Sequence, residues 1–293
     1  MNGFLNLLKP PGMSSGACVA TIKRLTGERV GHAGTLDPEA AGVLPVMIGR
    51  ATRLLDYLPD KTKSYVAEIA FAGATDTQDA QGTVIVPAVR VPEREEIEAA
   101  LSSFRGAIMQ RPPAYSALKK DGVPLYALAR RGQTVETKAR ETVIDELTLG
   151  EKTGTDGYML SVSCGSGTYI RTLCNDIGAA LAAPAHMRFL LRTRHGSFHI
   201  EDSATIEEIM AAAEQGNLSD HLLPLDGPLG ALAALRVPEK YWKLARNGGK
   251  LPAGIGPELA ENQRARVYAG DELLGIAHRE ADVIRFDVGL IGG

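Results

Sequence analysis

The chain has 293 residues, of which 44% are hydrophobic and 23% charged, and its formal net charge is −3. This composition supports ordinary hydrophobic cores and excludes a disordered chain, and the length predicts two domains. The longest charge-free run, residues 157–170, is shorter than the roughly 20 apolar residues that cross a bilayer, and the N-terminus lacks a signal-peptide pattern, so we expect no membrane segment and a cytoplasmic protein.

Hydrophobic periodicity and chain-breaking residues predict alternating strands and helices in the first 223 residues. A strand is predicted at 5–8, and Ser14 or Ser15 then caps a helix that Gly27 ends. Further strands are predicted at 65–71, at 83–86 as its partner across a turn at 75–82, at 158–164 and at 188–200. Further helices are predicted at 93–104, from residue 171 or later to 183, and at 205–214.

A break in periodicity divides the chain near its C-terminal end. Proline and glycine dominate residues 224–230, which makes this run the best linker candidate. After it, a helix is predicted at 238–246 and short strands at 264–268, 272–278 and 283–288. The pattern predicts a large α+β domain over residues 1–228 and a small, mainly β domain over residues 232–293.

Basic residues gather in two stretches despite the negative net charge. Residues 111–140 hold seven basic side chains against two acidic ones, and residues 186–199 hold Arg188, Arg192 and Arg194 with no acid. The two stretches form either a stripe along a phosphate backbone or a pair of solvated loops, and charge alone does not decide between them. Tyr115 and Tyr126 either stack on bases or anchor the loop.

Several short motifs resemble cofactor-binding or metal-binding sequences but lack residues that such a site requires. Residues 165–170 lack the third glycine of a dinucleotide-binding loop, and His195 and His199 lack a third metal ligand. Asp76 and Asp79 fit a turn held by their own hydrogen bonds better than a calcium loop. The three cysteines are not spaced for a zinc ribbon, and an odd, sparse set is typical of a reducing compartment. We therefore expect no metal and no disulfide framework.

The most informative segment runs from Gly31 to Pro45 and reads GHAGTLDPEAAGVLP. Its glycines allow a tightly folded loop, and Pro38 keeps Asp37 out of the helical region. Asp37 is open to two interpretations. It is either a turn-forming residue or a catalytic carboxylate, and the second requires apolar surroundings and a cation that keeps it ionised.

This segment resembles the catalytic-aspartate motif of the bacterial tRNA pseudouridine synthase B family. Other segments resemble the family in the same order: KPPGMSS from Lys9, KSY at 63–65, GATDTQD from Gly73, QRPPAYSALK from Gln110, LYALARRG from Leu125, GSGTYIR from Gly165 and LLRTRHGSF from Leu190. The similarity covers nearly the whole chain. The last 60 residues resemble a small RNA-binding domain of the PUA type more weakly.

The resemblance implies a fold, an activity and a catalytic centre. The fold would be a pseudouridine synthase domain with a mixed, mainly antiparallel sheet flanked by helices, an RNA-gripping insertion at about 108–142, and the PUA-like domain. The activity would be a cofactor-free isomerisation of uridine 55 in the T-loop of tRNA. Asp37 would be the nucleophile, Arg171 its ion-pair partner and Tyr65 the group that stacks on the base, while Tyr169 would support the pair.

The resemblance also implies how RNA is held. His32 would occupy or brace the space left by the flipped base, and Leu190 would wall the pocket. The remaining substrate-binding candidates carry positive charge or an aromatic ring: Lys9, Arg111, Tyr115, Lys119, Tyr126, Arg130 and Arg192. The partner would be the T-stem-loop of tRNA, bound by a monomer. Two rival hypotheses are a non-catalytic RNA-binding or tRNA-folding protein and the family's guide-RNA-dependent relative, which works inside a multi-protein particle.

Overall fold

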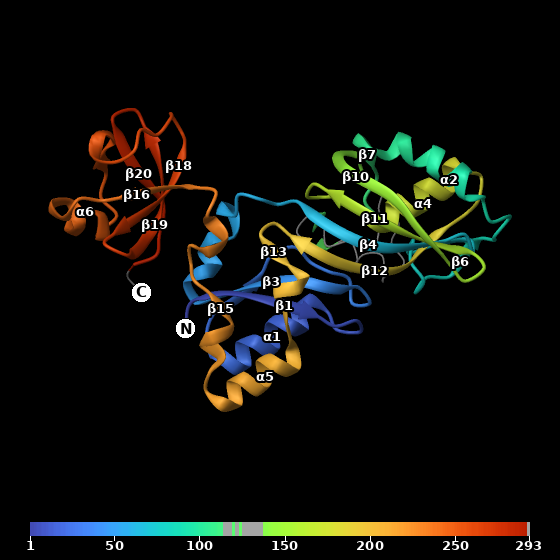
Figure 1. The fold of residues 1–293 in the computed structure, drawn as a ribbon, viewed down its shortest axis with the longest axis horizontal. Coiled ribbons are helices and arrows are strands. Elements are labelled where there is room, and N and C mark those ends of the chain that lie inside the picture. Colours follow the sequence, from blue (N-terminus) through green and yellow to red (C-terminus); the bar gives the residue numbers. More distant parts are fainter. Residues whose placement is uncertain (114–118, 121–122, 125–136, 292–293) are drawn as a thin grey trace.

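A computed structural model describes residues 1–113, 119–120, 123–124 and 137–291 of the chain, with the backbone alone at 119–120 and 123–124. Within these residues an 11-stranded sheet spans the first 223 positions, and a five-stranded sheet follows it (Figure 1). The strands of the large sheet are β1 (Gly3–Lys9), β2 (Val30–His32), β3 (Ala41–Ile48), β4 (Lys63–Ala70), β7 (Gly106–Gln110), β10 (Arg140–Thr153), β11 (Gly157–Cys164), β12 (His186–His195), β13 (Phe198–His199), β14 (Ala204–Thr205) and β15 (Leu222–Leu223).

The large sheet is mixed and mainly antiparallel, which confirms the predicted fold class. Its main path runs β14-β1-β3-β12-β4-β11-β10-β7. The pairs β1–β14 and β3–β12 are parallel, and the other neighbours on this path are antiparallel. β12 therefore joins the two halves of the sheet, and the short β3–β12 contact lies beside the loop that carries Asp37.

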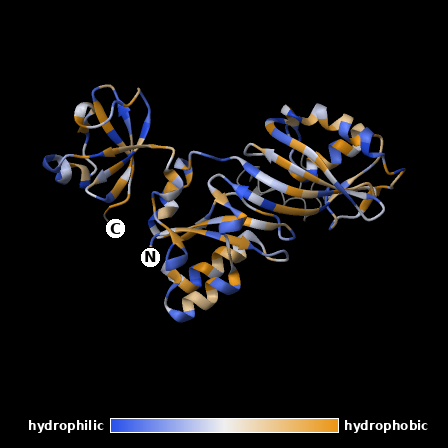
Figure 2. Ribbon diagram, in the orientation of Figure 1, coloured by the Kyte–Doolittle hydropathy of each residue, from blue (hydrophilic) through white to orange (hydrophobic). Residues whose placement is uncertain are grey.

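Helices cover each half of the sheet. They are α1 (Ser15–Thr26), α2 (Arg94–Leu101), α4 (Ile170–Ala180) and α5 (Ile206–Gln215). The apolar faces of α1 and α5 form one core with β1 and β3, and those of α2 and α4 form another with β4, β10 and β11. Figure 2 shows hydrophobic and hydrophilic residues alternating along these helices, as expected when one face packs on a sheet.

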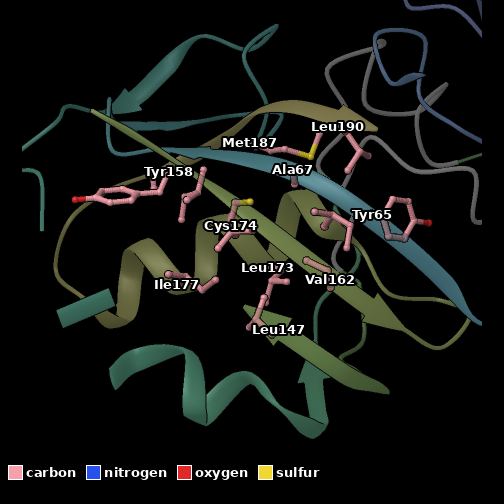
Figure 3. Close-up of a cluster of buried hydrophobic side chains, with 14 of the residues drawn as sticks. Tyr65, Ala67, Leu147, Tyr158, Val162, Leu173, Cys174, Ile177, Met187 and Leu190 are labelled. Atoms are coloured by element: carbon pink, nitrogen blue, oxygen red, sulfur yellow. The ribbon is translucent and has the colours of Figure 1, made fainter. Parts of the chain in front are cut away.

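The core under α4 ends at the candidate site. Its side chains come from α2, α4 and the strands that these helices cover. Tyr158 lies at one end of the cluster, and Tyr65 and Leu190 lie toward the other (Figure 3). Tyr65 and Leu190 are only 8% and 7% exposed. The packing that forms this core therefore also fixes two residues predicted to meet the substrate.

The second sheet begins after the predicted linker. Its order is β16 (Ala233–Arg236), β18 (Arg264–Ala269), β19 (Glu272–Glu280), β20 (Val283–Gly289) and β17 (Leu251–Pro252), with the short helix α6 (Trp242–Arg246) beside it. It packs on the first sheet through an apolar cluster that includes Phe4, Leu229 and Ile276. The Tyr268 hydroxyl also donates to the Asp226 carboxylate at 2.8 Å.

Three details of the predicted elements are wrong. The strand predicted at 188–200 is two strands, because Gly196 turns the chain with φ +58° between β12 and β13. The strand at 83–86, observed as β6 (Val84–Val86), pairs with β5 (Ala74–Thr75), because β11 and β12 already occupy both edges of β4. The helix expected from residue 171 begins at Ile170.

Short segments complete the described chain. The two-residue strands β8 (Lys119–Lys120) and β9 (Val123–Pro124) pair with each other in antiparallel register. Short 3₁₀ helices connect many of the described elements, and the longest of them, Gly49–Tyr57 with nine residues, follows β3. In the portion that the structure describes, no helix has both the length and the apolar character needed to span a membrane.

Candidate active site

A cavity of about 240 Å³ lies where the loop before β3 meets β4, β12 and the start of α4. Its lining residues are Gly34, Thr35, Leu36, Asp37, Lys63, Tyr65, Gly167, Thr168, Tyr169, Ile170, Arg171, Leu190 and Arg192. The cavity thus brings together Asp37, Tyr65, Tyr169, Arg171 and Leu190, which are far apart in the sequence. It contains apolar walls, one carboxylate and several cations.

Asp37 and Arg171 form a two-point ion pair in this cavity. The Arg171 Nε lies 3.0 Å from Asp37 Oδ2, and its Nη2 donates to Oδ1 at 3.2 Å. The Arg171 side chain is 6% exposed, whereas that of Asp37 is 41% exposed. The carboxylate is therefore held from the protein side while its other face remains open to the cavity.

Burial and charge act on the Asp37 carboxyl in opposite directions. Burial raises its pKa, and the positive charge of Arg171 lowers it. Asp79 raises this pKa further and Lys9 lowers it, and the net result is a pKa above the ordinary value of 3.8. The balance makes Asp37 a partly desolvated carboxylate, which is more reactive as a nucleophile than a hydrated one.

Arg171 is held by more than Asp37. Its Nη1 donates to the Thr77 carbonyl at 3.2 Å and lies 3.7 Å from Asp79 Oδ2. Asp79 belongs to the turn between β5 and β6, where its Oδ1 accepts from Gln81 N as expected for a hydrogen-bonded turn. The sequence analysis missed its second contact, because only the fold brings this turn next to α4. An arginine in the first turn of a helix faces an unfavourable dipole, and these acids compensate for it.

Tyr169 and Arg171 reach the cavity from the same short segment. Tyr169 is the N-cap of α4 and is extended, with φ −107° and ψ 109°. The Gln110 side chain holds its peptide by accepting from Tyr169 N at 3.0 Å and donating to its carbonyl at 3.3 Å. Gln110 is a supporting residue that the sequence analysis did not identify.

Tyr65 sits on β4 directly opposite Arg192 of β12. Burial raises the pKa of its hydroxyl, and the nearby Arg192 guanidinium partly offsets this. The phenol is therefore protonated at neutral pH and can donate a hydrogen bond. Leu190, two residues before Arg192 on the same strand, forms the adjacent wall of the cavity.

Two of the predicted substrate-binding residues are buried. Lys9 is 0% exposed, and its ammonium donates to the carbonyls of Pro10, Met13 and Pro38 at 2.8, 2.5 and 2.8 Å. Arg192 is 1% exposed, and its guanidinium donates to the carbonyls of Gly34 and Val43, both at 2.8 Å. Both side chains hold the backbone around Asp37. The three bonds use all the donors of the Lys9 ammonium, so its predicted contact with RNA is wrong, whereas Arg192 also lines the cavity.

Close packing explains two glycines of the Asp37 loop. At Gly42, with φ +116°, a Cβ atom would lie 2.2 Å from the Arg192 carbonyl oxygen. At Gly34, with φ +68°, a Cβ atom would lie 2.8 Å from Cε1 of His195. His195 is 7% exposed and therefore lies inside the protein beside this loop. Burial and neighbouring cations lower its pKa to about 3, which keeps it neutral.

Acidic side chains pair with two arginines of the second basic stretch. Arg188 pairs with Glu68 and Asp156, both at 2.9 Å, and Arg194 pairs with Asp60 at 2.6 Å. Arg192, between them in the sequence, is buried because the pairing of β12 with β4 shifts register on both sides of it, between Met187 and Phe189 and between Arg192 and Arg194. Lys63, which the sequence analysis did not select, instead lines the cavity and donates to the Ser166 hydroxyl at 3.2 Å.

The structure describes only some of the remaining residues that were predicted to bind the substrate. His32 ends β2, opposite Val46, and does not line the cavity. Arg111 is exposed at the start of the predicted insertion. Tyr115, Tyr126 and Arg130 lie outside the described residues, as does the side chain of Lys119. Within the described ranges, no group of three His, Cys, Asp or Glu side chains is arranged to hold a metal ion.

Two family domains match this chain, and together they cover the residues of the cavity described above. Residues 23–170 match the domain described as "TruB family pseudouridylate synthase (N terminal domain)", and residues 171–230 match the "tRNA pseudouridylate synthase B C-terminal domain". Asp37 and Tyr65 lie in the first match, and Arg171 and Leu190 in the second. The two family matches therefore meet at the cavity.

Curated relatives and solved structures extend over nearly the whole chain. The tRNA pseudouridine synthase B of Listeria monocytogenes is 42% identical over 283 residues, covering 94% of this chain and 93% of the relative. That of Bacillus pumilus is 40% identical over 280 residues, covering 92% and 90%. A structure described as an H/ACA RNP bound to a substrate RNA containing 2′-deoxyuridine has a TM-score of 0.75 at 25% identity, covering 99% of this chain and 85% of the other.

Proposed function

The chain belongs to the TruB family of pseudouridylate synthases, and from this we propose that it isomerises uridine 55 in the T-loop of tRNA to pseudouridine. This reaction breaks the bond between uracil N1 and the ribose C1′ and forms a bond between uracil C5 and C1′. The observation that carries the proposal is the Asp37 carboxylate, held by Arg171 in a cavity that Tyr65 and Leu190 also line. No redox change or added group is required, so the isomerisation balances without a co-substrate.

Asp37 is the nucleophile in this proposal. Its carboxylate attacks either the ribose C1′ or the uracil ring, and the covalent intermediate divides one difficult step into two easier ones. The two-point contact with Arg171 keeps the carboxylate ionised and aimed at the cavity, although burial raises its pKa. Once the detached uracil has turned, C5 bonds to C1′ and the bond to Asp37 breaks, which returns the free carboxylate. C5 loses its proton, and N1 gains one.

The walls of the cavity select a flipped pyrimidine. Tyr65 offers an aromatic face for stacking and a phenol that can donate to the base, while Leu190 excludes water on the adjacent side. A base in a folded loop must leave its stack to reach this site, which requires a few kcal/mol. Tyr169 shapes the cavity and supports the ion pair from the start of α4.

The tRNA is gripped outside the cavity. Residues 111–140 carry an excess of positive charge and follow the edge strand β7, so we assign contact with the T-stem-loop to this insertion. The small C-terminal sheet supplies a second RNA-binding surface. We also propose that the enzyme works in the cytoplasm as a monomer.

The decisive test replaces Asp37 and measures product and binding separately. Asp37→Asn keeps the shape of the side chain but removes the charge, and we expect no pseudouridine in a tritium-release assay with a tRNA affinity close to that of the wild type. Glu39→Gln is the matched control, because Glu39 is an exposed acid two residues away. Turnover by Asp37→Asn would refute the assignment.

The solved relatives favour one rival hypothesis. The H/ACA RNP and a Cbf5-Nop10-Gar1 complex share the fold with TM-scores of 0.75. If this chain needed a guide RNA or partner proteins, the purified protein would be inactive on unmodified tRNA. We expect full activity of the purified chain, which would also exclude a purely RNA-binding role.

A further inference from the structure

Two adjacent serines at the start of α1 have different surroundings. Ser14 is exposed and caps the helix, with its Oγ accepting from Ala17 N at 3.1 Å. Ser15 is 2% exposed and faces the loop that carries Asp37. Its hydroxyl donates to the Leu36 carbonyl at 3.0 Å and accepts from Leu36 N at 2.9 Å. The helix N-cap and the loop contact are thus separate functions of neighbouring residues.

The contact of Ser15 fixes the backbone immediately before Asp37. The Leu36 side chain is 3% exposed and belongs to the core under α4, so both the backbone and the side chain of this residue are immobilised. On the other side of Asp37, the Pro38 carbonyl accepts from the Lys9 ammonium at 2.8 Å. The Asp37 carbonyl itself accepts from Ala40 N at 3.1 Å. Little backbone freedom is left at the residue that must meet both Arg171 and the substrate.

We propose that Ser15 is a positioning residue for Asp37, acting through the paired hydrogen bonds to Leu36; this rests on the proposed function, in which Asp37 is the nucleophile. A buried hydroxyl that satisfies both polar groups of one peptide residue leaves two orphaned groups when it is removed. The loop then shifts to find other partners or water. Because a displacement of about 1 Å can slow a reaction by about 100-fold, the effect falls on the chemical step rather than on RNA binding.

The test compares Ser15→Ala with Ser14→Ala. For each variant we would measure the melting temperature, the Kd for tRNA and the single-turnover rate constant at saturating enzyme. Ser15→Ala should lower the rate constant by roughly 10- to 100-fold, with a Kd within about threefold of the wild type. Ser14→Ala should lower the melting temperature through loss of the cap and leave the rate constant unchanged.

A further variant covers the case in which Ser15→Ala does not fold. Ser15→Cys is of similar size and keeps a weak donor and acceptor, so its rate should lie between those of Ser15→Ala and the wild type. A wild-type rate constant for folded Ser15→Cys and folded Ser15→Ala would overturn the proposal. Equal slowing by Ser14→Ala and Ser15→Ala would overturn it as well, because it would point to a general loss of stability.

The pH profile supplies a readout that stability alone does not move. The charged groups facing Asp37 are Arg171 on α4 and Lys9 on β1, which lower its pKa, and Asp79 on the turn after β5, which raises it. A carboxylate displaced from Arg171 loses the largest of the stabilising charges. We therefore expect the rate constant to begin falling at a higher pH in Ser15→Ala than in the wild type, and at an unchanged pH in Ser14→Ala.

The outcomes separate the two proposals. An active Asp37→Asn variant would refute the proposed function, whatever Ser15 does. An inactive Asp37→Asn variant together with a fully active, folded Ser15→Ala variant would refute only the positioning role.

Discussion

Replacing Arg171 by methionine would test the electrostatic basis of the site. Methionine keeps the length and much of the volume of the side chain but cannot pair with Asp37. The substitution removes the two contacts with Asp37 at 3.0 and 3.2 Å and the donor to the Thr77 carbonyl at 3.2 Å. It also leaves Asp37 and Asp79 facing each other without the cation between them.

The size of the effect follows from the burial of the two partners. Breaking a fully buried ion pair destabilises a protein by about 3–5 kcal/mol. The Arg171 side chain is 6% exposed, but that of Asp37 is 41% exposed, so water replaces part of the lost interaction. We expect a loss of about 2–3 kcal/mol in the free energy of unfolding. If the transition state loses a similar amount of stabilisation, about 2.7 kcal/mol, the activation free energy rises by that amount and the reaction is roughly 100-fold slower.

Two measurements check this reasoning. Urea unfolding gives the change in stability, and single-turnover tritium release as a function of pH gives the rate. Because Arg171 lowers the pKa of Asp37, its removal should also move the acid limb to higher pH. Arg188→Met is the control, since Arg188 forms two ion pairs away from the cavity. A folded Arg171→Met variant with wild-type rate and pH profile would refute the argument.

The remaining predictions concern the base-stacking residue, the loop support, RNA binding and pH. Tyr65→Phe should slow the chemical step more than it weakens tRNA binding, because the ring remains and only the donor is lost; a larger change in Kd than in rate would contradict this. Lys9→Met should reduce stability by about 2–4 kcal/mol in urea unfolding, because three partly buried carbonyls lose their donor; an unchanged midpoint would exclude this role. Lys138→Gln and Arg140→Gln should each reduce the slope of log affinity against log salt by about 1, and an unchanged slope would place the phosphates elsewhere. In the wild type, the rate should fall with acid at a pH above 3.8, because the pKa of Asp37 is raised; a limb at or below that value would show an ordinary, hydrated carboxylate.

The sequence predicted the local elements well where one strong pattern dominates. The helix from Ser15 to Thr26 has its predicted N-cap and its predicted C-terminal glycine, Gly27. The helix at 206–215 likewise begins after Thr205, whose hydroxyl accepts from Glu208 N. Such caps involve residues three or four positions apart, so they are legible in a linear sequence.

The charge pattern left two interpretations open because a linear sequence does not show which side chains pair in the fold. Arg188, Arg192 and Arg194 have no acidic neighbour in the chain, yet Glu68, Asp156 and Asp60 neutralise two of them, and backbone carbonyls bind the third. These acids come from strands and turns that only sheet formation brings to β12.

By itself, the sequence determined the family, the order of most elements and the identity of the Asp37 loop, because each of these is encoded in contiguous residues. Only the tertiary structure decided which side chains meet at the cavity and which side chains instead hold the backbone around it. Lys9, Ser15 and Arg192 lie inside motifs that point to RNA or to catalysis, but their polar atoms bind the backbone around Asp37. The physical reason is that a buried donor or acceptor must find a partner within the fold, and that partner is set by three-dimensional packing rather than by position in the chain.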